Sequence, residues 1–120
     1  RELAALVLAR VAGPRAEALL LTVAAAFKVP PRALCARSRG HAGLARARHA
    51  AIYLAHVHFG FSPGPATGFV GRHRTLLHHA CRRIEDARDD AAFDARCDGL
   101  ALAAAGLAAA LAVSNPEEAR

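Results

Sequence analysis

The chain contains no methionine and no tryptophan, and tyrosine and phenylalanine together make up only 5% of its residues. Alanine supplies much of the 54% hydrophobic fraction instead. Alanine favours helices, and a shortage of β-branched and aromatic residues disfavours strands. No segment shows the apolar–polar alternation of a strand. The composition therefore predicts an all-α fold, and the missing methionine leads us to expect a processed or truncated chain.

Cysteine occurs only three times, at Cys35, Cys81 and Cys97, and no two of these residues form a C-x-x-C pair. An odd number of widely spaced cysteines does not make a disulfide framework, so we expect reduced thiols in a cytoplasmic protein. The N-terminus has an apolar run but not the pattern of a cleavable secretory signal. The apolar run at residues 100–113 is shorter than the roughly 20 residues of a membrane span, so we expect no membrane association.

Enzyme motifs are also missing. No G-x-x-x-x-G-K-[ST] sequence is present, which excludes a nucleotide-binding ATPase loop of that type. Asp86, Asp89 and Asp90 lie at a charged helix end, where solvation explains them. The seven histidines form no H-x-x-x-H pair. His78 and Cys81 lie three residues apart on one predicted helix, but they are not part of a zinc-site motif. We therefore expect no enzymatic activity, no cofactor and no bound metal.

Apolar residues recur at helical spacing along most of the chain. Residues 60–71 hold four glycines and two prolines, so they predict at most a short, distorted helix. We expect one helical domain over residues 1–120, with the functional region at 15–100 and an Ala/Leu helix with a frayed tail at 101–120. The spacing predicts a short helix from Pro31, a loop at 38–43, and longer helices at 2–12, 15–27, 44–59, 75–90 and 92–112.

Positive charge is concentrated in the middle of the chain. The whole chain carries a formal charge of +6, with a pI of about 10.6. Between Lys28 and Arg88, eleven Lys and Arg residues meet only two acids, a net charge of +9, while the flanks sum to −3. A solvated surface is the ordinary explanation of such a run. Because this run coincides with a helix–turn–helix pattern, it instead favours a nucleic-acid partner.

That pattern spans residues 49–87, which predict a helix, a broken connection and a second helix. Arg72 and Arg74 stand at the start of the second helix. Positive charge at a helix N-terminus opposes the helix dipole, so this placement favours an anionic partner. In a helix–turn–helix the first residues of the second helix approach base edges, and its free amides suit a phosphate.

Several short motifs follow one another along the same region. V-A-A-A-F occupies residues 23–27, and A-R-A-R occupies residues 45–48, ahead of I-Y-L-A at 52–55. V-G-R-H-R-T-L-L-H-H-A at residues 70–80 then leads into C-R-R-I-E at 81–85. Each motif alone is a weakly specific signal. Together, in this order and with this spacing, the motifs are a fairly specific one.

In that order the motifs resemble the C-terminal, origin-binding domain of the bacterial replication initiator DnaA. The resemblance covers about residues 19–100 and implies a compact, Trp-repressor-like helical bundle with a helix–turn–helix. It implies sequence-specific binding of double-stranded DNA at DnaA-box-like sites, in control of replication initiation or transcription, without ATPase activity. The implied partners are duplex DNA and a full-length initiator or another replication protein, and the implied location is the nucleoid in the cytoplasm.

The resemblance also implies roles for individual residues. Arg46 matches the arginine that enters the minor groove, and Arg72 matches the arginine of the signature G-G-R-D-H-T-T. Thr75 matches the first threonine, which touches bases in the major groove. Arg37 and Arg39 lie near the loop expected to contact phosphates. The full set of candidate DNA-contacting residues is Arg37, Arg39, Arg46, Arg48, Arg72, His73, Arg74, Thr75, Leu76 and His79.

The chain departs from this signature at residues 73, 74 and 76. His73-Arg74 replaces the Asp-His pair, and Leu76 replaces the second threonine. We expect loss of the aspartate to remove a helix cap worth roughly 1 kcal/mol. Arg74 keeps a donor, adds charge and favours guanine, so DNA affinity should persist while preference for the box changes.

An alternative hypothesis is that the DNA face is degenerate and the domain works through protein contacts, with residues 100–113 as a docking or dimer surface. The two hypotheses differ over residues 60–71. DNA binding requires a helix there that supports the second helix of the motif.

Overall fold

The structure, a computed structural model, describes residues 12–37 and 42–114. This part of the chain is helical and has no strand, which confirms the all-α fold predicted from composition. The predicted helix at 2–12, most of the predicted loop at 38–43, Arg39 and the tail after residue 114 lie outside the described residues. The elements are α2 (Pro14–Phe27), α3 (Pro31–Leu34), α4 (Ala42–Tyr53), η1 (Leu54–His58), α5 (Pro63–Gly68), η2 (Arg74–Leu76), α6 (Leu77–Ala87) and α7 (Ala91–Ser114).

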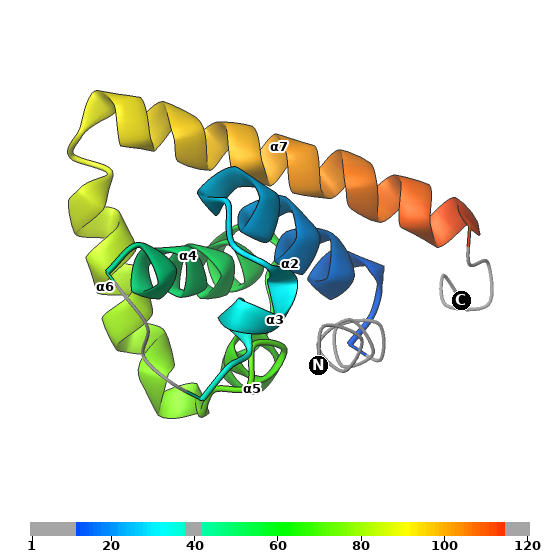
Figure 1. The fold of residues 1–120 in the computed structure, drawn as a ribbon, viewed down its shortest axis with the longest axis horizontal. Helices are drawn as coiled ribbons and strands as arrows, with labels where there is room; N and C mark the ends of the chain where they lie inside the picture. The colour runs from blue at the N-terminus through cyan, green and yellow to red at the C-terminus, as the bar shows by residue number, and fades with distance from the viewer. Residues whose placement is uncertain (1–11, 38–41, 115–120) are drawn as a thin grey trace.

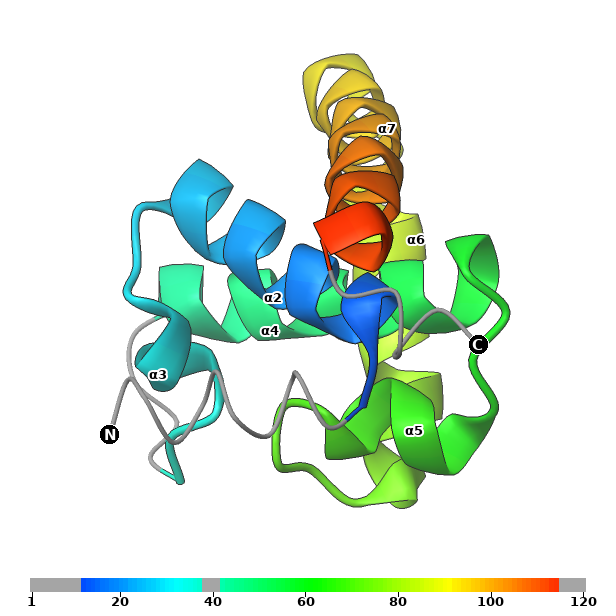
Figure 2. The same ribbon diagram turned by 90° about the vertical axis from the view of Figure 1, so that its right-hand side faces the viewer.

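The helices are stacked in layers around α2 (Figure 1). α2 packs against α7 on one side and against α4 on the other, and α6 descends from the start of α7 to pack across α4. Figure 2 shows α3 and α5 on the side of α4 that lies away from α7. This arrangement brings the N-terminal part of α4 and all of α6 together at one end of the molecule.

Alanines make this close stacking of helices possible. Seven of the twelve residues of α4 are buried, and Ala47, Ala50 and Ala51 are fully inaccessible to solvent. A methyl side chain lets neighbouring helix axes approach to the short end of the usual 8–10 Å range. Tyr53, the last residue of α4, is only 7% exposed.

α7 is one continuous helix of 24 residues. Phe93, Cys97, Leu100 and Ala104 recur along it at helical spacing and are buried. The predicted division at residue 100 therefore falls inside a single helix. By length and composition alone, Ala91–Val113 could cross a membrane, with a mean hydropathy of 1.5. This helix is longer than the apolar run considered in the sequence, although one of its sides packs on α2.

The glycine- and proline-rich segment at residues 60–71 forms a short helix, α5, followed by a turn. Pro63 stands at its start, where a missing N–H costs nothing. Ala66 and Thr67 are fully buried, and the Thr67 hydroxyl donates to the Pro63 carbonyl at 3.0 Å. α5 packs against α4, η2 and α6, so it supports the start of the helix that follows.

Candidate nucleic-acid interface

The turn before η2 is held against the chain that follows α3. Gly71 has φ +70°, and a Cβ atom there would lie 3.4 Å from the Cys35 carbonyl oxygen. A residue with a side chain would therefore be strained as well as crowded at this position. Arg72 donates from Nη2 to the Ala36 carbonyl at 2.7 Å. These contacts fix where the start of η2 lies relative to Arg37.

The start of η2 is capped by His73. Its Nδ1 accepts a hydrogen bond from the Thr75 backbone N–H at 3.2 Å, and the Thr75 hydroxyl lies 3.1 Å from the same nitrogen. An imidazole nitrogen that accepts carries no proton, so this contact uses the neutral ring. Our expectation that loss of the family's aspartate removes the cap is therefore wrong, because the histidine in its place supplies the acceptor.

A cleft of about 690 Å³ lies between α4 and the start of α6. Three of its lining residues are arginines, and no carboxylate lines it among residues 12–37 and 42–114. Seven of the ten candidate DNA-contacting residues meet there, although they are spread over 43 positions of sequence. They are Arg37, Arg48, Arg72, His73, Thr75, Leu76 and His79, and Ala45 and His49 complete the lining.

Arg48 has a structural part in this cleft. It is only 4% exposed, and it donates from Nε to the Leu34 carbonyl at 2.8 Å and from Nη2 to the Ala33 carbonyl at 3.1 Å. These oxygens end α3; the Ala33 carbonyl also accepts from the Ala36 N–H at 3.3 Å, whereas Arg48 supplies the donor to the Leu34 carbonyl. Burial, together with nearby Arg72, lowers the pKa of Arg48 below its ordinary value. Arg48 therefore joins α3 to α4, and the donors named here are not free to contact DNA as predicted.

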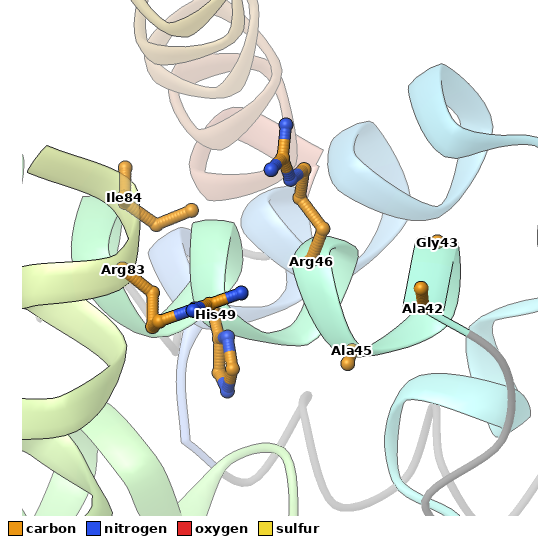
Figure 3. A pocket seen from close by; sticks show the side chains of 7 residues that line it. All are labelled: Ala42, Gly43, Ala45, Arg46, His49, Arg83 and Ile84. Carbon is orange, nitrogen blue, oxygen red and sulfur yellow. The ribbon is translucent and has the colours of Figure 1, made fainter. Parts of the chain in front are cut away.

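The other candidate residues lie apart from this group. Arg46 is exposed and its guanidinium sits 5.1 Å from the centre of the Phe93 ring in α7. Figure 3 shows its side chain pointing away from His49 and Arg83. Arg74 is exposed at the start of η2 and lines neither cleft described here. Arg39 lies outside the described residues.

A second cleft, of about 380 Å³, continues from the first along α4 (Figure 3). Ala45 and His49 line both clefts, so the two form one surface, here called the α4–α6 groove. The residues that line only the second cleft are Ala42, Gly43, Arg46, Arg83 and Ile84.

His49 and Arg83 are groove residues that no sequence motif singled out. The available signal was spacing along α6, because Arg83 follows His79 by four residues and Thr75 by eight, which places all three on one side of a helix. His49 faces them from α4, and no sequence spacing relates it to α6.

His49 and His79 are in contact across the groove. Their ring centres are 5.3 Å apart, and the rings meet edge to face at 82°. Burial lowers the pKa of His49 to about 4, and positive charge on His79, Arg83 and Arg48 adds to the effect. His49 is therefore neutral at physiological pH in the folded protein.

This low pKa predicts that acid destabilises the protein. Unfolding returns His49 to an ordinary pKa of about 6.5, so the unfolded chain binds more protons between pH 6.5 and pH 4. Because the ring remains partly in water, we expect the free energy of unfolding to fall by about 1–2 kcal/mol over that window. Urea denaturation at pH 7, 6, 5 and 4 measures the loss. His49→Gln should flatten this dependence relative to wild type, and an unchanged pH profile in the variant would contradict the assignment.

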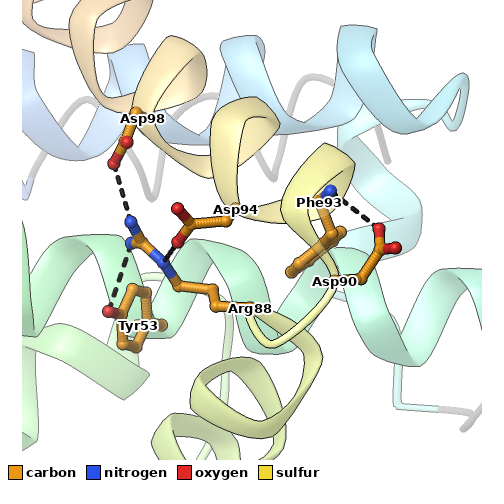
Figure 4. Close-up of polar contacts among 6 residues, drawn as sticks. All are labelled: Tyr53, Arg88, Asp90, Phe93, Asp94 and Asp98. Carbon is orange, nitrogen blue, oxygen red and sulfur yellow. Dashed lines mark hydrogen bonds and ion pairs between the residues drawn. The ribbon is translucent and has the colours of Figure 1, made fainter.

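Arg88, the last residue of the basic stretch, is directed away from the groove and joins three helices (Figure 4). It donates from Nε to Asp94 at 2.6 Å, from Nη2 to Asp98 at 2.7 Å and from Nη1 to the Tyr53 hydroxyl at 3.3 Å. The hydrogen bond to Asp94 is the main reason that its pKa is raised. Asp90, near by, caps α7 by accepting from the Phe93 N–H at 2.9 Å.

We expect Arg88→Met to lower the free energy of unfolding by about 1–2 kcal/mol, because three charge-assisted or neutral hydrogen bonds are lost while the carboxylates remain hydrated. Chemical denaturation measures the change. Arg82→Met, on the exposed side of the same helix, is the matched control and should alter stability by less than about 0.5 kcal/mol. Equal losses in the two variants would show that Arg88 does not join the helices.

The groove offers donors and positive charge. All three cysteines are free, and burial raises the pKa of Cys35, Cys81 and Cys97, which keeps them as thiols at neutral pH. Within residues 12–37 and 42–114, no group of three or more His, Cys, Asp or Glu side chains is placed to hold a metal ion. Among the described residues, the groove presents arginine and histidine side chains and no carboxylate.

Comparison with protein-family models, curated proteins and solved structures finds no match for this chain. The similarity to the DnaA domain therefore rests on the motifs at residues 23–27, 45–48 and 70–85, and a function has to be argued from the groove itself.

Proposed function

We propose that this protein binds double-stranded DNA through the α4–α6 groove and the start of α6, as an initiator-like domain that regulates replication or transcription. The observation that carries the proposal is the composition of the groove. Arginines and histidines from α4, α6 and the segments after α3 and α5 converge on it, and no carboxylate lines it among the described residues.

Electrostatics at the helix start support an anionic partner. Arg72 and Arg74 stand at the N-terminal end of η2 and α6, and neither helix has an acid in its first turn. Their charge opposes the positive end of the helix dipole, which is unfavourable in the free protein. A phosphate at this position would accept from the arginines and would offset both charges.

The placement of side chains suggests a division of contacts. Arg37 and Arg72 line the groove and suit phosphates, which fix the position of a DNA-binding protein on the duplex. Arg74 and Thr75 are exposed at the helix start and suit base edges in the major groove. α5 supports this start from beneath, which is the condition that distinguished DNA binding from its alternative.

Fluorescence anisotropy with a labelled duplex tests the proposal. One duplex carries a DnaA-box-like site and the other a scrambled sequence, and each is titrated across a salt series. Affinity should fall by about 0.9 log units per tenfold rise in salt for each phosphate contacted. A preference for the box of roughly 4 kcal/mol or more would mean that bases are read. Equal, salt-sensitive binding would mean that the backbone alone is bound, and no binding at low salt would overturn the proposal.

A second candidate function is protein contact through α7, with a second copy of this chain as the partner. Leu102 is 74% exposed and Val113 is 82% exposed. Together with Gly99, Gly106 and Ala109 they recur at alternating steps of three and four, the spacing of paired helices. Sedimentation equilibrium tests this candidate: a dimer that Leu102→Glu converts to a monomer supports it, and a monomeric wild-type protein removes it.

A further inference from the structure

His49 occupies the point where the two clefts of the α4–α6 groove meet. It is half-buried, lines both clefts, and contacts His79 with ring centres 5.3 Å apart. Arg83 reaches toward it from α6 (Figure 3). The His49 ring is therefore only partly accessible to solvent. A ligand that spans both clefts of the groove would contact it.

The charged groups around His49 all have the same sign. Arg46 and Arg48 come from its own helix, His79 and Arg83 from α6, and Arg37 and Arg72 from the segments that follow α3 and α5. The two acids of α6, Glu85 and Asp86, line neither cleft. Among the described residues that line the groove there is therefore no carboxylate to stabilise a positive charge on His49.

We propose that the α4–α6 groove is a proton-linked phosphate site, in which a phosphate of the DNA backbone seated between His49, His79 and Arg83 is bound together with a proton on the His49 ring. The inference rests on the proposed DNA binding and concerns its regulation by pH. The proton comes from solvent and neutralises part of the phosphate charge, and the protonated ring gains a second donor.

The direction and size of the effect follow from linkage. In the free protein the pKa of His49 is about 4. A phosphate that restores an ordinary pKa of about 6.5 makes the complex bind more protons than its separate components, so affinity rises as pH falls. For that change, the contribution of His49 tightens binding by about tenfold between pH 7.5 and pH 5.5.

The test is the ratio of the Kd at pH 7.5 to the Kd at pH 5.5, measured by anisotropy with one duplex at constant ionic strength. Wild type should give a ratio about tenfold larger than His49→Gln. His58→Gln is the matched control, because His58 is exposed and lines neither cleft, and it should keep the wild-type ratio. Equal ratios for wild type and His49→Gln would overturn the proton linkage while leaving DNA binding intact. Absence of binding at both pH values would instead overturn the proposed function.

A second measurement reads the proton directly. The NMR shift of the His49 ring is followed against pH in the free protein and in the complex with a short duplex. The titration midpoint should move upward from about 4 when DNA binds. If the midpoint of the His49 titration does not move although other NMR signals show that the duplex is bound, the proposal is contradicted. This readout does not depend on a measured Kd.

Discussion

Arg48→Met should lower the free energy of unfolding by about 3 kcal/mol, which corresponds to a fall in melting temperature of roughly 12 °C. The substitution roughly preserves side-chain volume but removes the donors that bond to the Leu34 and Ala33 carbonyls. The Leu34 carbonyl is left without this donor, which costs about 1–3 kcal/mol, and the Ala33 carbonyl keeps only its 3.3 Å hydrogen bond from the Ala36 N–H. Thermal and urea denaturation followed by circular dichroism measure the loss.

Arg37→Met is the control for this experiment. It removes the same charge from the same cleft, but Arg37 is exposed, so stability should change by less than about 0.5 kcal/mol. If both variants lose stability equally, general charge in the groove is responsible and the joining of α3 to α4 by Arg48 is not. If neither does, the hydrogen bonds of Arg48 do not hold the fold together.

The double substitution Arg37→Ala with Arg74→Ala should weaken binding of duplex DNA by roughly 30- to 100-fold at moderate salt. Each side chain is exposed at the proposed interface, and the loss of one direct contact typically costs about 1–3 kcal/mol. The slope of log affinity against log salt should also become shallower by about one for each phosphate contact removed. Anisotropy titrations across a salt series measure both quantities.

A charge-matched double variant separates contact from net charge. Arg15→Ala with Arg96→Ala removes the same two charges from residues outside the groove, where each guanidinium lies over a phenylalanine ring. This variant should bind within a few-fold of wild type. An equal loss of affinity in both double variants would mean that overall charge attracts the DNA, and would count against a defined interface in the groove.

Local pattern was sufficient for much of the fold. Apolar spacing predicted α4 and α6 because both helices bury one continuous stripe, and the density of glycine and proline predicted the short α5. Pattern failed where a distant residue decides the environment. Nothing in the local pattern relates Tyr53 to Arg88, 35 residues later, which donates to the Tyr53 hydroxyl.

The candidate site shows the same limit. The cluster around residues 72–79 could be selected because its members are neighbours in sequence. Arg83 could have been found from its spacing to His79, whereas His49 could not be selected, because it meets α6 only through the packing of α4 on α6. Arg48 matched a motif, but only the position of the end of α3 shows that its donors are taken. The capping role of His73 depends on a backbone geometry that the residue type alone does not reveal.

Backbone amide NMR shifts, recorded while a short duplex is added to the labelled protein, test the central claim most directly. If DNA occupies the α4–α6 groove, the largest shifts should fall on residues 45–49, on residues 72–79 and on Arg83. The exposed side of α7, including Leu102 and Gly106, should remain unchanged. Shifts confined to α7, or no shifts at low salt, would contradict DNA binding at this groove.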